Sequence, residues 1–259
     1  MFFLYIDNFF VPLQAIRTIM FMYLTENIIK LLALICCYLA AVRDAETALP
    51  EEVCRELPAI VSAAQPDCER QQWITLDDST ELVMVASMMT KEKAGTFPDT
   101  DKYFTIDGGE LWVTLPYDLE AHFMRRLPTC NDSTVCRMRM LQLLGLPPTC
   151  DYDCLMIFYA DKKSIIRPTP DNETTDHVAE LSFPKTATKE YREWFEDNMR
   201  ASYHSGNPYP WTRLGYTYDW NCDTPSHVGP GEFIVTRGAK AKKVRQVDIW
   251  TWYNEILTK

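Results

Sequence analysis

Residues 103–115, YFTIDGGELWVTL, carry the clearest fold signal in the chain. Two short apolar runs flank the turn Asp107–Gly109, and glycine tolerates the positive φ angles that tight hairpin turns require. The stretch therefore predicts a β-hairpin, with Tyr103–Ile106 as its first strand and Glu110–Leu115 as its second.

The sequence around this hairpin predicts further strands and helices in irregular order. Strands are expected where apolar or β-branched residues gather between turn residues: 73–76, 81–89, 155–160, 212–220, and a closing hairpin of 233–235 with 242–247. Helices are expected where apolar residues recur every three or four positions: 51–65, 116–127, 135–144 and 188–203. Since strands and helices do not alternate regularly, we expect an α+β fold, with a mixed or antiparallel sheet and two to four packed helices.

Length and charge narrow the possible classes of protein. The chain has 259 residues, of which 47% are hydrophobic, and a net charge of −10. This composition excludes a wholly disordered chain. The acidic balance argues against a nucleic-acid binder, which needs cationic contacts to phosphate. We expect one α+β domain over residues 42–259, with a weak internal boundary near 91–102.

The first 41 residues have the layout of a secretory signal. A positive residue is followed by an uncharged run, 31–42, that is too short to span a bilayer. We expect cleavage after Ala41 and a secreted or periplasmic protein, with Met20 or Met22 as a possible true start. The alternative is a retained helix that is buried or anchors the protein, which would be its sole contact with a membrane.

The cysteines indicate disulfides if the chain is exported. Seven cysteines follow the expected signal, and six of them lie in near pairs along the sequence: Cys54 with Cys68, Cys130 with Cys136, and Cys150 with Cys154. Exported proteins commonly use such cysteines as disulfides, although spacing does not define connectivity. A zinc site formed by the last four is the alternative, but its spacing is wider than usual, so we expect no metal. The remaining Cys222 is expected to pair with another cysteine, or else to act with His227 as a nucleophile.

Familiar catalytic motifs are missing from the sequence. It contains no glycine-rich phosphate loop, no H-E-x-x-H and no G-x-S-x-G. Most nucleotide-binding enzymes, zinc proteases and α/β-hydrolases are thereby excluded. We expect no cofactor and favour a protein that acts by binding.

Residues 208–220, PYPWTRLGYTYDW, form the densest aromatic block. Aromatic side chains combine a large apolar area with a polar edge, which suits recognition of sugars or proteins. The candidate binding residues in this block are Trp211, Arg213, Tyr216, Tyr218 and Trp220. The alternative is a core strand whose polar face points outward.

A polar loop follows the apolar strand 155–160. Loops that leave strands often carry binding groups, and Arg167 and Asp171 are the candidates here. The loop has the charge to hold a cation or a basic partner, but it lacks a recognisable ligand spacing such as an EF-hand. A solvated acidic loop is the alternative.

Residues 229–238, GPGEFIVTRG, loosely resemble the closing hairpin of ADP-ribosyltransferases. In that family a glutamate begins the strand and orients the nicotinamide ribose, while an arginine grips NAD. The resemblance implies a catalytic role for Glu232 and NAD as the cofactor. Arg167 or Arg213 would have to supply the arginine, although neither lies in a matching motif. About ten residues carry the resemblance.

Our leading hypothesis from the sequence is an exported, disulfide-stapled binding module, either an inhibitor or an immunity-type partner. Its ligand would be another protein or a saccharide. One alternative is an enzyme of the ADP-ribosyltransferase type that uses Glu232. Another is a carbohydrate-acting enzyme with a carboxylate pair drawn from Asp219, Asp223 and Glu232.

Overall fold

The two segments predicted as hairpins instead pair with each other. Strands β5 (Tyr103–Thr105) and β12 (Lys240–Asp248) are antiparallel neighbours, and so are β6 (Leu111–Val113) and β11 (Phe233–Val235). The two turns lie side by side, since Ile106 and the turn at Gly238–Ala239 exchange backbone hydrogen bonds of 2.8 and 3.0 Å. Each turn thus carries its chain from one sheet to another, and the prediction of two hairpins is wrong.

The computed structural model describes residues 3–6, 9–47, 57–61, 70–77, 79–98, 100, 102–125, 132–224 and 226–258. The remaining strands are β1 (Phe3–Ile6), β2 (Phe9–Pro12), β3 (Trp73–Asp77), β4 (Thr80–Met89), β7 (Cys154–Asp161), β8 (Ile165–Ile166), β9 (Tyr216–Tyr218) and β10 (Val228–Gly231). The helices are α1 (Leu13–Thr47), α2 (Lys91–Gly95), α3 (Pro116–Arg125), α4 (Ser133–Leu143), α5 (Lys189–His204) and α6 (Ile249–Leu257), with a short 3₁₀ turn at Lys162–Ser164.

The expected α+β class is confirmed, with antiparallel sheets. The larger sheet has the order β3-β4-β7-β12-β5, and a smaller one has the order β6-β11-β8. Alternate residues of the central strand β7 face different layers. Met156 and Phe158 pack toward the smaller sheet with Phe233, while Leu155 and Ile157 pack against the helical layer of α3, α4 and α6. Both faces of β7 are therefore buried, as its uninterrupted apolar sequence predicts.

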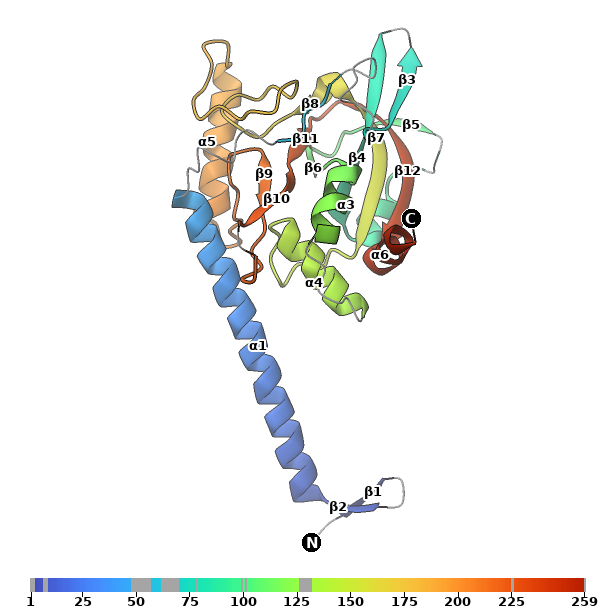
Figure 1. Ribbon diagram of the computed structural model, residues 1–259, viewed down its shortest axis with the longest axis vertical. Helices are drawn as coiled ribbons and strands as arrows, with labels where there is room; N and C mark the ends of the chain where they lie inside the picture. Colours follow the sequence, from blue (N-terminus) through green and yellow to red (C-terminus); the bar gives the residue numbers. More distant parts are fainter. Residues whose placement is uncertain are drawn as a thin grey trace.

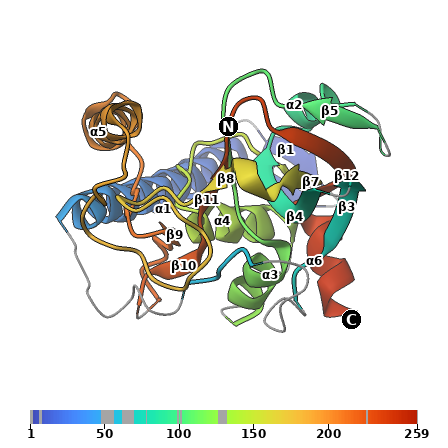
Figure 2. The same cartoon turned by 90° about the horizontal axis from the view of Figure 1, so that it is seen from above.

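Two helices, α4 and α5, begin or end at residues whose local chemistry suits a helix terminus. Asp132 caps α4 and Thr188 caps α5, because each side chain accepts hydrogen bonds from backbone N–H groups of the first turn. Gly145 follows α4 with a φ of 68°, a conformation that glycine adopts without strain. Helix α5 lies on the opposite side of the molecule from β3 and β5 (Figures 1 and 2), and the segment carrying β9 and β10 lies between.

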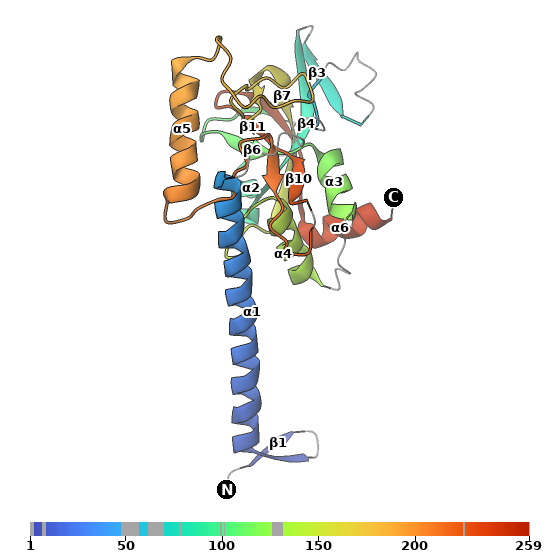
Figure 3. The ribbon, with the colours of Figure 1, turned by 60° about the vertical axis from the view of Figure 1, so that its left-hand side comes forward.

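Helix α1 projects away from the rest of the molecule (Figures 1 and 3). Its carboxyl-terminal turns contact the body through Tyr38, Ala41, Val42 and Ala45. Earlier in the helix, large apolar side chains are exposed, including Met20, Phe21, Met22, Tyr23, Leu24, Ile28, Ile29, Leu31 and Leu32. Within the described residues, no helix is both long enough and apolar enough to cross a membrane.

The described part of the chain contains one disulfide, between Cys37 and Cys222. Cys150 and Cys154, both expected to form disulfides, are free thiols. Cys136 is buried in the helical layer, while Cys130 lies outside the described residues. Cys54 and Cys68 also lie outside them.

Three predicted elements differ from those observed. The described part of the helix expected at 51–65, residues 57–61, has no helical structure. The loop expected at 91–102 begins with α2. The strand expected at 212–220 shortens to β9, since Arg213 and Gly215 have φ angles of 62° and 76° that interrupt an extended conformation. The weak domain boundary near 91–102 stays a prediction.

Candidate functional site

A cavity of about 430 Å³ opens where the two sheets separate. Strands β4 and β6 are joined by a bridge between Ala86 and Thr114, and the chains diverge beyond it. Side chains from α5, from the turn after α4 and from the aromatic block close the space. Its lining includes Met88, Glu110, Trp112, Thr114, Leu146, Asn198, Ser202, Tyr209, Trp211, Tyr218 and Glu232. This volume falls in the range of small-molecule sites.

Glu232 is the buried carboxyl group of the cavity. It directly precedes β11, and its backbone N–H donates to the carbonyl of Gly215 at 2.9 Å. Burial raises the pKa of its side chain to about 8. Its Oε2 atom is buried and has no hydrogen-bond partner among the described residues. Below about pH 8 the group is therefore a neutral acid, able to donate one hydrogen bond and to accept others.

Three other side chains of the lining also have a buried polar atom without a hydrogen-bond partner among the described residues. Eight buried side-chain polar atoms in the described part of the chain have no hydrogen-bond partner, and four of these line the cavity. They are Thr114 Oγ1, Asn198 Nδ2, Trp211 Nε1 and Glu232 Oε2. A buried polar atom without a partner costs about 1–3 kcal/mol, so native proteins rarely collect several in one place. Because the four atoms belong to residues that line one cavity, the cluster marks this cavity as the candidate ligand site.

The strand register explains why the side chains of Thr114 and Glu232 lie on the same face of the sheet. Phe233 pairs with Val113, and continuing that register sets Glu232 opposite Thr114. Residues directly opposite in an antiparallel pair point to the same face of the sheet. The Thr114 hydroxyl and the Glu232 carboxyl therefore share one face of the smaller sheet.

Aromatic rings form much of the remaining lining. Trp211 lies edge-on to Trp112, with ring centroids 6.0 Å apart, and it also packs against Phe195 of α5 at 4.9 Å. Tyr209 is 41% exposed and lies at the rim of the cavity. These rings give the site apolar faces next to its polar atoms, a combination that suits a ligand with both kinds of surface.

Glu110 is a second carboxyl group in the lining. It accepts a hydrogen bond of 3.1 Å from Trp194 Nε1, and burial raises its pKa above the usual value. The register places Glu110 four residues from Glu232 along the paired strands, which corresponds to about 13 Å between Cα atoms. This exceeds the ~5 Å carboxyl separation of retaining glycosidases, unless both side chains turn inward.

The aromatic block divides between the cavity and the core. Trp211 and Tyr218 line the cavity. Tyr216 instead packs with Leu57 and Leu214, and Trp220 is buried against Tyr38. Tyr216 and Trp220 are therefore core residues, as the alternative interpretation of this block expected.

Arg213 lies outside the cavity lining. Its guanidinium donates hydrogen bonds to the carbonyls of Ala45 and Glu46 at 3.3 and 2.8 Å. It also lies over the ring of Tyr203, at 5.5 Å from the centroid. Arg213 thus joins the aromatic block to the end of α1.

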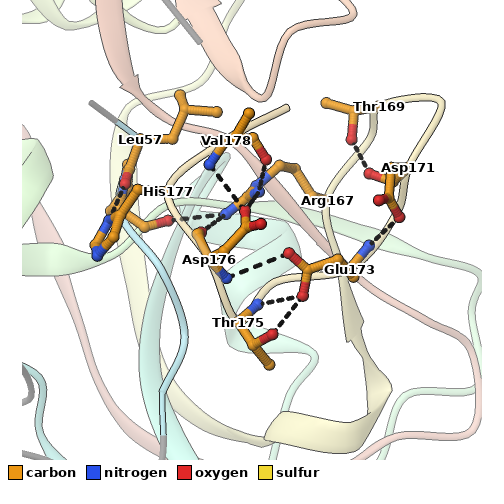
Figure 4. Close-up of polar contacts among 10 residues, drawn as sticks. Leu57, Arg167, Thr169, Asp171, Glu173, Thr175, Asp176, His177 and Val178 are labelled. Carbon is orange, nitrogen blue, oxygen red and sulfur yellow. Dashed lines mark hydrogen bonds and ion pairs between the residues drawn. The ribbon is translucent and has the colours of Figure 1, made fainter. Parts of the chain in front are cut away.

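Arg167 organises its own loop (Figure 4). Its side chain is fully buried and donates to the carbonyls of Val178 and Asp176, each at 2.7 Å, and to that of Pro58 at 3.3 Å. Asp171 accepts a hydrogen bond from the backbone N–H of Glu173. Neither residue lines the cavity. The described residues hold no cluster of three or more histidine, cysteine or acidic groups placed for a metal ion.

The carboxylate pairs expected with Glu232 are not assembled. Asp219 is buried in a bidentate ion pair with Arg139, with distances of 2.6 and 2.9 Å, and Asp223 is exposed. Neither lines the cavity. The Cys222–His227 nucleophile is excluded as well, because Cys222 is in the disulfide.

Sequence reasoning missed Glu110, Trp112, Thr114 and Asn198. Alternation along residues 110–114 indicated that the first three share one face, and this was a usable signal. It did not reveal that Glu232 would lie beside them, because that depends on pairing between strands 120 residues apart. Asn198 had no signal, since it is one polar residue of an amphipathic helix.

Together, the fold and cavity define an α+β protein with one aromatic-walled site that contains a buried acid. Comparisons with known proteins add no closer assignment. The chain matches no protein-family model, no curated protein and no solved structure.

Proposed function

We propose that the protein binds a small, neutral, polyhydroxylated ligand in this cavity, with a saccharide unit as the chemical class. The observation that carries the proposal is the convergence of Thr114, Asn198, Trp211 and Glu232, whose buried polar atoms lack partners within the described structure. Sugar hydroxyls both donate and accept hydrogen bonds, so they match this mixed set. The faces of sugar rings pack on aromatic side chains.

The charge of the site favours a neutral ligand. Glu232 is uncharged below about pH 8, and among the described residues Lys93 is the single cationic side chain in the lining. Lys93 is itself exposed. An anion such as a phosphate would therefore find no buried positive charge to offset its desolvation. The size of the cavity also favours a small ligand over the protein partner considered from the sequence.

We place the protein outside the cytosol. The disulfide between Cys37 and Cys222 supports this location, because disulfides persist in oxidising compartments. The same bond favours a retained N-terminal helix over cleavage after Ala41, since cleavage there removes Cys37.

Saccharide binding is tested by calorimetry with a panel of methyl glycosides and short oligosaccharides, using the full chain. We expect one sugar to bind, with at least tenfold lower affinity in Glu232→Leu and in Asn198→Leu. Asp223→Asn is the matched control, because that carboxylate is exposed and lies outside the cavity. Absence of binding across the panel, with the protein folded by circular dichroism, would refute the proposal.

The second candidate is an enzyme of the ADP-ribosyltransferase type. In its favour, Glu232 stands in a cavity wall immediately before a strand, as the resemblance implies. Against it, neither Arg167 nor Arg213 lines the cavity, so the arginine expected to hold NAD is missing from the described lining. Incubation with labelled NAD distinguishes the two candidates. Turnover that Glu232→Gln abolishes would support the enzyme, and turnover that survives the substitution would remove it.

A further inference from the structure

The last turns of α1 form a layer directly behind one wall of the cavity. Tyr38, Ala41 and Val42 are buried in one cluster with Tyr218 and Trp220. Tyr218 also lines the cavity, so this side chain belongs both to the cavity wall and to the cluster that includes the helix. The position of this wall therefore depends on where the end of α1 is held.

Polar contacts hold the helix to the same segment. The Tyr38 hydroxyl donates to the carbonyl of Pro208 at 2.6 Å, just before the lining residues 209–211. Arg213 donates to the carbonyls at the end of α1, those of Ala45 and Glu46. Segment 208–220 is thus attached to α1 near both of its ends, since the disulfide-bonded Cys222 lies two residues beyond Trp220.

We propose that the Cys37–Cys222 disulfide is a redox-controlled clamp on the cavity wall formed by residues 208–220. When the bond is intact, α1 holds Tyr218 and the segment before Trp211 in place. When the bond is reduced, the end of α1 loosens and the wall becomes mobile. A mobile wall should also bind the ligand more weakly; this expected loss of affinity rests on the proposed function, whereas the mobility of the wall does not.

The bond is accessible to a reductant. Cys222 is exposed and Cys37 is half-buried. A small dithiol attacks one sulfur atom as its thiolate and forms a mixed disulfide, and its second thiol then closes a ring and releases the protein. Two electrons and two protons pass from the dithiol to the protein. The products are two cysteine thiols and one cyclic disulfide.

Other contacts around α1 are too few to replace the clamp. The helix has 35 residues, and the described side chains from Met20 to Leu32 are largely exposed. The packed region is confined to its last four turns. Because most of α1 projects away from the body, motion of the helix acts on the short packed region at its end. Once the disulfide is reduced, no covalent link limits that motion. The contacts of Tyr38 and Arg213 remain available, so we expect loosening rather than global unfolding.

Hydrogen exchange with mass spectrometry tests the clamp without any ligand. The protein is the full chain carrying Cys36→Ser, which removes the exposed free thiol beside Cys37 and prevents exchange between them. Oxidised, dithiothreitol-reduced and reoxidised samples are compared with a Cys37→Ser/Cys222→Ser variant. We expect at least tenfold faster exchange in peptides of 34–47 and 208–220 after reduction, reversal on reoxidation, and the same fast exchange in the variant.

Peptides from β4 and β7 serve as the internal control, because they lie in the larger sheet. Their exchange should stay unchanged, and a parallel rise there would indicate global unfolding and overturn the clamp. Unchanged exchange in 208–220, or peptide mapping that finds the Cys222 thiol free in the native protein, would overturn it too. If the wall loosens but no saccharide binds in either state, the clamp stands and the proposed ligand is wrong.

Discussion

Replacing Glu232 by glutamine should abolish a specific pH dependence of stability. The folded pKa of Glu232 is about 8, against an ordinary value of 4.5. Between these values the unfolded chain has lost the proton and the folded chain has kept it, so stability falls as the pH rises. At pH 7 the gap of 2.5 units, at 1.36 kcal/mol per unit, corresponds to about 3 kcal/mol. This is an upper figure, because the side chain borders a cavity that admits water.

The assay is urea unfolding at pH 5, 6, 7 and 8, for the wild type and for Glu232→Gln. The wild type should lose up to about 3 kcal/mol between pH 5 and 8 relative to the variant, because glutamine is neutral throughout. Asp223→Asn is the control for a carboxyl group that is exposed. Parallel pH profiles for the wild type and Glu232→Gln would refute the assignment of Glu232 as a buried neutral acid, and with it the electrostatic argument for a neutral ligand.

Three further substitutions test contacts that support the site, and their effect on the free energy of unfolding is measured by thermal or urea unfolding. Arg139→Ala should cost about 3–5 kcal/mol, because it leaves Asp219 buried without its charge partner; a loss below 1 kcal/mol would contradict the buried pair. Gly229→Ala should destabilise by more than 1 kcal/mol, since the new methyl group collides with Thr217 and no open space adjoins it; a neutral effect would show that the packing is wrong. Thr188→Ala should cost about 1 kcal/mol through loss of the cap of α5, and Thr188→Ser should restore most of it.

Local sequence chemistry predicted helices α4 and α5, which support the candidate site. The cap at Thr188 and the stop at Gly145 act within a few residues, so the sequence alone predicted them, whereas the cap at Asp132 was found only in the structure. The same holds for β7, whose apolar run had to be buried on both faces. Turn chemistry was also correct locally, since Gly109 and Gly238 have φ angles of 117° and 89°.

Pairing between distant segments could not be predicted. A turn signal reports which backbone angles are allowed, and it does not say which strand edge the chain meets after the turn. The disulfide shows the same limit, because Cys37 and Cys222 are 185 residues apart and their spacing predicts nothing. Close spacing is no better guide, because Cys150 and Cys154 are near each other in sequence and both are free thiols.

By itself, the sequence determined the α+β class, the approximate bounds of α3, α4 and α5, and the buried central strand, and it singled out Glu232, Trp211 and Tyr218 as candidate site residues. Only the tertiary structure decided that Thr114 and Asn198 line the same cavity as Glu232, Trp211 and Tyr218. It also decided that Arg167, Arg213 and Trp220 lie outside the lining and support the surrounding structure. The physical reason is that caps, turns and periodicity are short-range effects. A cavity, in contrast, exists only where elements distant in the chain fail to fill the space between them.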